Sequence, residues 1–319
     1  MITLEKNKYD EKNKYDLIIL GAGVAGLSAG IYAARYKIKT LIIGKDMGMA
    51  AEAPEIENYP GFTKISGLKL LQKFTRHAKK MGAKIIYDEI KKVEKIGNEF
   101  KVITSGNEFI SDAIIYALGG KKRRLGIENE EKYVGKGVSY CSTCDANFFK
   151  DKVVGVLGGA NSAATTSLLL SKIAKKVYII YRGDKLKAEP ILISKIQKAK
   201  NIEIIYNTVV SGLIGEEKLE EVILENKKTG EKINMKLDGI FVEFGYVPNS
   251  LFAEEIGAKI SEDGRVIVKE DMSTNVEGLF AAGDITTGSN RLDQIITAAA
   301  EGAIAANSAY KYLSKKHKD

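Results

Sequence analysis

The sequence predicts an α/β protein of two doubly wound, three-layer domains, one inserted in the other. Three observations predict this architecture. The chain has 319 residues, enough for two domains of ordinary size. An apolar run, a glycine-rich turn and a helical stretch follow one another at residues 17–36, and the same order recurs without a gap with Gly158 in the place of Gly21. The only two cysteines, Cys141 and Cys144, precede the second copy. Such a repeat indicates two Rossmann-like units, each with its own dinucleotide site.

The first copy begins with Leu17–Leu20, an all-apolar run typical of a central parallel strand. Gly21, Gly23 and Gly26 follow directly, before a helical stretch and a second strand at Thr40–Ile43. In this setting the first glycine permits the tight turn, the second lets a pyrophosphate approach the backbone, and the third lets the helix pack on the strand. The segment therefore predicts a dinucleotide-binding βαβ unit.

An uncharged run at residues 17–34 is long enough to suggest a membrane span. The segment before it carries acidic residues as well as lysines, unlike the start of a signal peptide. Four glycines weaken the run as an apolar helix, and its second copy lies deep in the chain. Strand, turn and helix explain the run better, so we expect no membrane segment.

Short strands and one helix are predicted between the first copy and a charged break at Lys121–Arg124. The predicted segments in this part are a loop at Met47–Gly61, a helix at Leu68–Met81, and strands at Ile85–Tyr87, Ile90–Ile96, Phe100–Thr104, Phe109–Ile110 and Ala113–Ala117. We expect the first four of these strands to form a small antiparallel sheet. The charged break is a candidate domain boundary.

The second copy and the last part of the chain continue the alternation of strands and helices. The predicted elements are strands at Lys152–Leu157, Val177–Tyr181, Glu203–Tyr206, Val222–Glu225, Ile233–Leu237 and Gly239–Phe244, and helices at Pro190–Lys200 and about Leu292–Leu313. Gly245–Asn249 is the second candidate boundary. A further strand ends at Gly283 and Asp284, where a carboxylate could hold a cofactor hydroxyl or simply cap a turn.

Composition excludes several classes of function. Net charge is +8, but lysine and glutamate are interleaved, so we expect a solvated surface and no nucleic-acid partner. Two cysteines are not a secreted disulfide framework; in a cytoplasmic chain they indicate a redox pair or half of a zinc site. A zinc site would need two ligands besides the cysteines. Because the chain has only two histidines in all, we expect no metal, and we expect the cysteines to be a cytoplasmic redox pair.

The chain resembles the low-molecular-weight thioredoxin reductases from about Tyr15 to Leu313. The motifs that carry the resemblance are the first glycine turn, Glu57–Gly61, Cys141-Ser-Thr-Cys144-Asp145, the second glycine turn, Gly245-x-x-Pro-Asn249, Gly283-Asp284 and Gln294-Ile-Ile-Thr-Ala-Ala. The resemblance implies an FAD-binding domain of residues 1–120 and 249–319, and an inserted pyridine-nucleotide domain of residues 121–248 that carries the cysteines. It also implies FAD on the first copy, NADPH on the second, and a homodimer.

Individual roles follow from the same resemblance. It implies Cys144 as the thiol next to the flavin, Cys141 as the interchange thiol that attacks the partner disulfide, and Asp145 as the acid or base for a leaving thiolate. Asp145 is alternatively a plain helix cap. The residues implied to bind FAD are Gly21, Gly23, Val24, Ala25, Gly26, Asn58, Gly119, Gly283, Asp284, Gln294 and Ile295. Gly158, Arg182 and Lys187 would serve the second dinucleotide.

The second nucleotide site departs from the family pattern. Ala160 replaces the middle glycine, and its methyl group would push a pyrophosphate away from the backbone. In the segment that usually holds the 2′-phosphate, Gly183 and Lys187 replace two arginines, so bidentate phosphate contacts are lost. We therefore expect NADP(H) to bind weakly or not at all. The FAD site departs less, although Asp293 stands where the family has an arginine before Gln294.

The predicted function is a flavin-dependent dithiol oxidoreductase that reduces thioredoxin or a glutaredoxin-like protein. Two alternatives remain open. One is a disulfide reductase like the alkyl hydroperoxide reductase flavoprotein, and the other is a redox-sensing flavoprotein. On the mechanism, our hypothesis is that the inserted domain rotates to expose Cys141 after the disulfide has been reduced.

Overall fold

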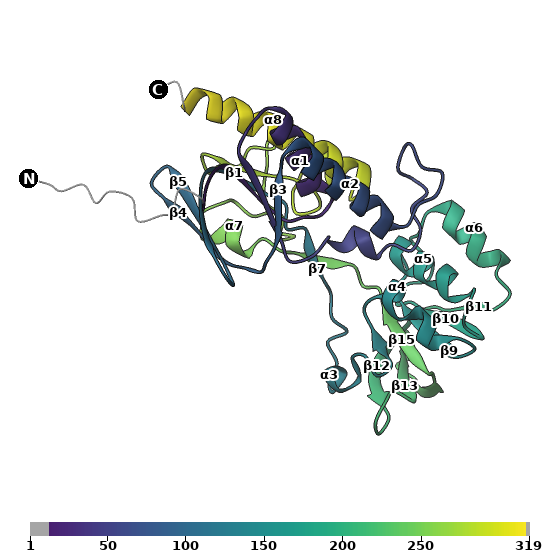
Figure 1. Ribbon diagram of the computed structural model, residues 1–319. Helices are drawn as coiled ribbons and strands as arrows, with labels where there is room; N and C mark the ends of the chain where they lie inside the picture. Colours follow the sequence, from purple (N-terminus) through teal and green to yellow (C-terminus); the bar gives the residue numbers. More distant parts are fainter. Residues whose placement is uncertain (1–12, 317–319) are drawn as a thin grey trace, which may run out of the picture. The chain divides into compact units, whose positions relative to one another are not determined.

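The structure is a computed structural model that describes residues 13–316 (Figure 1). Contacts divide the chain into two compact units. The first unit holds the chain up to Lys121 and again from Pro248, and the second holds Lys122–Val247. Within residues 13–316, no helix combines the length and the apolar composition needed to cross a membrane.

The first unit is built on a seven-stranded sheet in the order β3-β2-β1-β6-β5-β4, with β17 paired to the end of β6. Its strands are β1 (Lys14–Leu20), β2 (Thr40–Gly44), β3 (Lys84–Tyr87), β4 (Ile90–Ile96), β5 (Glu99–Thr104), β6 (Glu108–Tyr116) and β17 (Leu279–Ala281). Its helices are α1 (Val24–Arg35), η2 (Met49–Glu52), α2 (Gly67–Met81), α7 (Leu251–Glu255), η4 (Ser289–Arg291) and α8 (Ile295–Lys316). The parallel strands β2, β1, β6 and β17 end at one edge, where the chain order reverses between β1 and β6.

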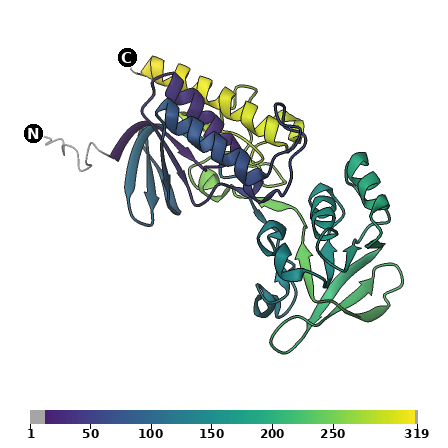
Figure 2. The same cartoon turned by 45° about the vertical axis from the view of Figure 1, so that its right-hand side comes forward.

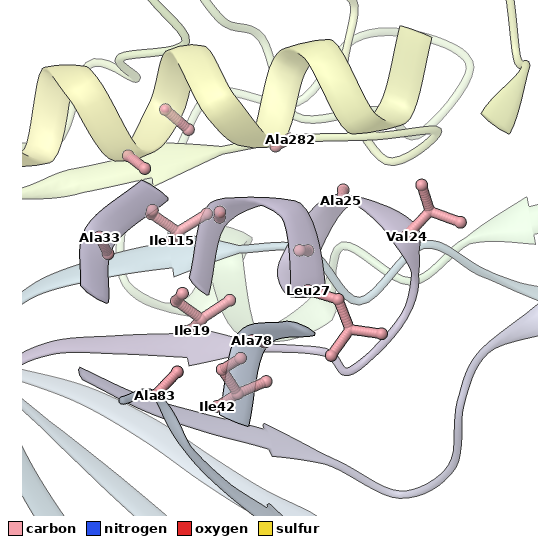
Figure 3. Close-up of a cluster of buried hydrophobic side chains, with 14 of the residues drawn as sticks. Ile19, Val24, Ala25, Leu27, Ala33, Ile42, Ala78, Ala83, Ile115 and Ala282 are labelled. Atoms are coloured by element: carbon pink, nitrogen blue, oxygen red, sulfur yellow. The ribbon is translucent and has the colours of Figure 1, made fainter. Parts of the chain in front are cut away.

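Alternating side chains of the central strands divide the core into two layers. Leu17 and Ile19 of β1 belong to the cluster covered by α1, α2 and α8, which lie side by side in Figures 1 and 2. Figure 3 shows Ile19 and Ile115 in this cluster, close to α1. Ile18 and Leu20 belong to the opposite cluster, which includes Val102 of β5. The second half of the strand, Leu17–Leu20, is apolar throughout because both of its faces are buried.

The predicted small antiparallel sheet is partly wrong. β4, β5 and the first half of β6 do pair antiparallel, but they belong to the main sheet. β3 pairs parallel with β2, as in Ile42↔Ile85, and has no place in the antiparallel part. The two strands predicted at 109–110 and 113–117 are one strand, β6, whose first half meets β5 and whose second half meets β17. Strand direction depends on the crossover by α2, which short apolar runs do not reveal.

The second unit has a five-stranded parallel sheet in the order β11-β10-β9-β15-β8 and an antiparallel sheet of β12, β13 and β14. The strands are β8 (Val138–Ser139), β9 (Val153–Leu157), β10 (Lys176–Ile180), β11 (Ile202–Ile205), β12 (Thr208–Ile214), β13 (Glu221–Asn226), β14 (Lys232–Lys236) and β15 (Gly239–Val242). The helices are α3 (Glu130–Tyr133), α4 (Ser142–Asp145), η3 (Ala146–Phe149), α5 (Asn161–Leu170) and α6 (Pro190–Lys198).

The internal repeat is confirmed at the level of register. Leu17 faces Thr40 in the first unit, and Val154 faces Val177 in the second, at the positions that the sequence repeat equates. The helices α1 and α5 begin at equivalent positions after their glycine turns. The predicted α/β fold with two Rossmann-type units is therefore confirmed. The two segments that connect the units, β7 (Gly120–Lys122) and β16 (Tyr246–Pro248), pair with each other.

Candidate redox and nucleotide sites

The first glycine turn combines two tightly packed glycines with one open glycine. A side chain at Gly21, whose φ is +113°, would place its Cβ 2.1 Å from the carbonyl oxygen of Ala117. A side chain at Gly26 would meet the carbonyl oxygen of Gly21 at 1.9 Å. At Gly23 the only atom of residues 13–316 within 4 Å of such a Cβ, apart from its own chain neighbours and helix backbone, is the carbonyl oxygen of Met47, at 3.9 Å. The turn is therefore held by its outer glycines, and the surface over Gly23 is free for a ligand.

The N-terminus of α1 is suited to an anion. Gly23 is its N-cap residue and offers no side chain to the first amides, and no acidic residue lies in the first turn. The amides of Val24 and Ala25 belong to this turn, where helix N–H groups lack intrahelical partners and the helix dipole favours negative charge. These features fit the pyrophosphate of a dinucleotide such as FAD.

Two polar residues from distant parts of the first unit, both predicted to approach the flavin, contact each other. The side-chain amide of Asn58 donates to Oε1 of Gln294 at 2.9 Å. Ile295 follows Gln294 as the first residue of α8. Gly119 lies just after β6 with φ of +57°, and a Cβ at this position would meet no other part of the described chain within 4 Å. The structure thus brings Asn58 and Gln294 together, as their common predicted role requires.

Asp284 lies in a buried polar cluster after β17. Burial, followed by the charge of Asp293, raises the pKa of Asp284 to about 6, while Arg265 opposes this rise. Glu301 of α8 is 3% exposed and accepts hydrogen bonds from the amide of Gly283 at 2.8 Å and from the Thr286 hydroxyl at 2.9 Å. Glu301 therefore fixes the turn that presents Asp284.

In the second unit, Cys141 and Cys144 form a disulfide at the one-turn helix α4. Cys141 is half-buried and Cys144 is exposed. Cys141 is the N-cap of α4, and its sulfur accepts the amide N–H of Cys144 at 3.3 Å. On reduction, this N–H and the start of the helix favour a thiolate on Cys141.

Asp145 is held beside the disulfide by a serine. Ser139 donates its hydroxyl to Oδ2 of Asp145 at 2.7 Å, and the same hydroxyl oxygen accepts the amide of Cys141 at 3.1 Å. Asp145 precedes η3, but its side chain makes no capping hydrogen bond there. Asp145 therefore does not act as a side-chain cap of η3, and its acid–base role toward the cysteine pair stays a prediction.

A second hydroxyl network, which sequence reasoning missed, anchors α4 to the nucleotide unit. Thr166 of α5 is 3% exposed and donates to Oε1 of Glu243 at 2.7 Å. Its oxygen lies 2.9 Å from the hydroxyl of Ser142, which therefore donates to Thr166. The three residues come from α4, α5 and the end of β15, so only the tertiary fold could reveal them.

The second glycine turn repeats the packing of the first but closes its open position. A Cβ at Gly158 would lie 2.5 Å from the carbonyl oxygen of Glu243, as Gly21 lies against Ala117. Ala160, at the N-cap of α5, is exposed and carries a methyl group where Gly23 carries none. The methyl group occupies the approach that a pyrophosphate needs.

Tyr181 covers the rest of this turn. A Cβ at Gly159 or at Gly183 would lie 2.6 Å from the Tyr181 ring, so the ring packs against both glycines. The amide of Lys187 donates to the carbonyl oxygen of Gly159 at 2.7 Å, while the Arg182 and Lys187 side chains are exposed. The ring therefore stands over the backbone that a dinucleotide would approach.

An acidic group also stands at the start of α5. Asn161, its first residue, donates to Oε1 of Glu189 at 2.9 Å and accepts the amide of Glu189 at 2.8 Å. A carboxylate beside a helix N-terminus competes with phosphate for the same amides. Together with Ala160 and Tyr181, it makes this turn a poor fit for NADP(H).

Comparisons with known proteins agree over most of the chain. The family model described as pyridine nucleotide-disulphide oxidoreductase matches residues 15–302. The thioredoxin reductase of Bacillus subtilis is 40% identical over 96% of this chain and 96% of its own. The Lactococcus lactis thioredoxin reductase structure matches with a TM-score of 0.90 at 36% identity, covering 94% of this chain and 99% of its own. The T. acidophilum thioredoxin reductase structure matches with a TM-score of 0.89 at 37% identity, covering 94% and 98%.

Proposed function

We propose a function from the premise that the chain belongs to the pyridine nucleotide-disulphide oxidoreductase family and, within it, to the thioredoxin reductases. The chain is a flavin-dependent thioredoxin-disulfide reductase. Cys141 and Cys144 form its redox-active pair, and the physiological disulfide is that of thioredoxin or a glutaredoxin-like protein. The observation that carries the proposal is the bonded cysteine pair with Asp145 beside it, in a chain whose other unit has an open glycine cradle.

FAD is the cofactor proposed for the first unit, and when bound it supplies two electrons for reduction of the disulfide. Gly21 and Gly26 shape the turn, and the amides at the start of α1 would hold the pyrophosphate, with no side chain at Gly23 in the way. Asp284 would accept a hydrogen bond from a ribitol hydroxyl. Asn58 and Gln294, held together by their mutual hydrogen bond, would orient the ring.

Transfer to the partner then needs only the chain's own residues. The Cys141 thiolate attacks one sulfur of the partner disulfide, forming a mixed disulfide and releasing a partner thiolate, which takes up a proton. Asp145, held by Ser139, is the proposed source of that proton. The Cys144 thiol next gives its proton back to Asp145 and attacks, as a thiolate, the sulfur of Cys141, which restores the Cys141–Cys144 disulfide. The second partner sulfur leaves as a thiolate and takes up a proton from solvent, so the partner departs as a dithiol. Two electrons leave the pair and two reach the partner.

The electron donor is the point at which we propose a departure from the family. NADP(H) binds the second unit weakly or not at all, because of the Ala160 methyl group, the Tyr181 ring over Gly159 and the carboxylate of Glu189. A reductant other than NADPH would then feed the flavin.

The partner surface and the assembly are proposed on chemical grounds. Phe148 is 73% exposed and lies on η3, directly after the cysteine turn, where it offers an apolar contact to an incoming protein. We further propose a homodimer that acts in the cytoplasm, where a dithiol–disulfide pair can cycle because thiols are kept reduced. No nucleic-acid partner is proposed.

A turnover assay tests the function. Anaerobic protein carrying FAD is reduced photochemically in the presence of excess oxidised thioredoxin, and new thioredoxin thiols are counted by reaction with a chromogenic disulfide. An enzyme produces many thiols per protein under continued illumination. A redox-sensing flavoprotein, the alternative that the closed second turn favours, stops after one oxidation. Illuminated Cys141→Ser protein controls for direct reduction of thioredoxin by light.

A further inference from the structure

Arg265 is a largely buried cation of the first unit that binds several neighbouring segments. Its side chain is 12% exposed. Nη1 and Nη2 donate to the two carboxylate oxygens of Asp293, at 2.7 and 2.8 Å, in the bidentate geometry that guanidinium favours. Nη1 also reaches the backbone carbonyl oxygens of Asp284 at 3.2 Å and Thr286 at 3.4 Å. Nε donates to Asp263 at 3.2 Å.

A tight turn holds Arg265 in this position. The amide of Ser261 donates to the carbonyl oxygen of Arg265 at 2.8 Å, and the Ser261 hydroxyl oxygen accepts the amide of Arg265 at 3.1 Å. Gly264, with φ of +86°, supplies the left-handed residue that the turn needs. The next residue, Val266, is fully buried and donates its amide to the carbonyl oxygen of Ile285 at 2.8 Å. The backbone that carries the Arg265 side chain is therefore anchored on both sides.

We call the hydrogen bonds of the Arg265 side chain to Asp284, Thr286 and Asp293 the clamp. The clamp joins two segments to which FAD contacts are assigned. One end holds the backbone of Asp284, the ribitol residue, and the other holds Asp293, directly before Gln294. The family pattern has an arginine at the position of Asp293, and here a guanidinium reaches that residue from a separate turn. Loss of Arg265 would leave the carboxylate of Asp293 close to Asp284 without its counter-charge.

We propose that Arg265 is a positioning residue of the FAD site, which ties the turn that presents Asp284 to the start of α8 that presents Gln294. The inference rests on the proposed binding of FAD to the first unit. Arg265 acts through the two segments and through their charge, and makes no contact with FAD itself. Its positive charge also favours the ionised form of Asp284, which is the form that accepts a hydroxyl hydrogen bond.

The test measures FAD binding and not catalysis. Apoprotein prepared by removing FAD is titrated with FAD, and the quenching of flavin fluorescence gives the dissociation constant. We expect Arg265→Met to raise that constant by at least about tenfold at neutral pH, because it removes charge-assisted hydrogen bonds on both segments. Arg265→Lys keeps the charge but loses the bidentate geometry, and should lie between wild type and Arg265→Met.

A pH series separates this role from a merely structural one. The charged groups around Asp284 are Arg265 from the turn, Asp293 before α8, and Glu301 on α8. We expect the pH midpoint of FAD binding to move upward in Arg265→Met, because one positive charge is removed from Asp284, and to stay near the wild-type value in Arg265→Lys. A variant that is only less stable would keep the wild-type midpoint.

Arg291→Met is the matched control. Arg291 carries the same charge two positions before Asp293 and also faces Asp263, at 3.4 Å, but its side chain is 55% exposed and outside the clamp. It should bind FAD like wild type. If Arg265→Met does not fold, Asp293→Asn replaces it, with an expected rise of about threefold in the dissociation constant. The inference is wrong if the variant tested has the wild-type dissociation constant for FAD and the wild-type pH midpoint of FAD binding. The proposed function is wrong instead if the wild-type protein binds no FAD.

Discussion

The side-chain amide of Asn58 donates a hydrogen bond to the side-chain carbonyl oxygen of Gln294 at 2.9 Å, although 236 positions separate the two residues. One residue lies in the loop before α2 and the other lies directly before α8. The bond closes the first unit across the region assigned to the flavin ring. It also leaves one amide hydrogen of Asn58 and the amide group of Gln294 for other partners.

This pair predicts a coupling that a double-mutant cycle can measure. Asn58→Ala and Gln294→Ala should each weaken FAD binding by about fivefold, since a neutral hydrogen bond contributes about 1 kcal/mol. The double variant should lose less than the product of the two single losses, because each single change already breaks the shared bond. Fluorescence titration of the apoproteins gives the four constants. Strictly multiplicative losses would show that the two residues act independently.

The roles of the two sulfurs can be separated by trapping. Cys144→Ser keeps the Cys141 thiolate, which the start of α4 stabilises, and should accumulate a mixed disulfide with thioredoxin. Cys141→Ser should give little adduct. Non-reducing electrophoresis and mass spectrometry read the result, with the double serine variant as the blank. An adduct formed only by Cys141→Ser would reverse the assignment.

Opening the second glycine turn should increase NADPH binding in two steps. Ala160→Gly alone should have little effect, because the Tyr181 ring still covers Gly159. Ala160→Gly combined with Tyr181→Ala should tighten NADPH binding by about tenfold, since the backbone then becomes accessible to phosphate. Anaerobic bleaching of the flavin band against NADPH concentration measures the gain. Saturable bleaching of the unaltered protein at micromolar NADPH would contradict the premise.

Asp284 predicts how FAD affinity depends on pH. Its pKa is raised from 3.8 to about 6, so the folded apoprotein binds a proton more tightly than the unfolded chain and loses stability as pH rises from about 4 to 6. A hydrogen bond from a ribitol hydroxyl to the Asp284 carboxylate favours the ionised form of Asp284, so FAD binding releases a proton. FAD affinity should therefore rise by about tenfold between about pH 5 and 7.5. Asp284→Asn should flatten the titration, and a profile unchanged by that substitution would assign the dependence to another group.

The close contact of α8 with α1 predicts a large loss of stability. A Cβ at Gly302 would lie 2.2 Å from the backbone carbonyl oxygen of Ala25, at the start of the helix that follows the first glycine turn. Gly302→Ala should therefore cost about 3 kcal/mol or more, because backbone cannot move aside as a side chain can. Urea unfolding of both variants measures the cost, with Ile304→Ala, which is 40% exposed on α8, as control. Equal midpoints for the two would show that the helices shift freely.

The sequence predicted those parts of the molecule that local patterns determine. The two glycine turns, the helices after them and the strands on either side follow from spacing that is repeated along the chain. The parallel pairing of β3 with β2 was not predicted, because strand direction depends on the path of the chain through α2. Glu301, within an Ala-rich helix, gave no signal of its own, since its role depends on the amide of Gly283. Tyr181 and Arg265 were hidden for the same reason.

One contact in the first unit bears on how such a chain can be assembled. The amide of Asn249 donates to the carbonyl oxygen of Gly119 at 2.9 Å, so the polypeptide leaves the first unit and returns to it at neighbouring points. Because the second unit begins and ends at neighbouring residues of the first, its insertion leaves the strand pairing and core contacts of the first unit in place. Deleting it with a short glycine bridge is therefore a practical route to a free-standing half molecule. By the same logic, one recombination event could graft a different module onto this scaffold.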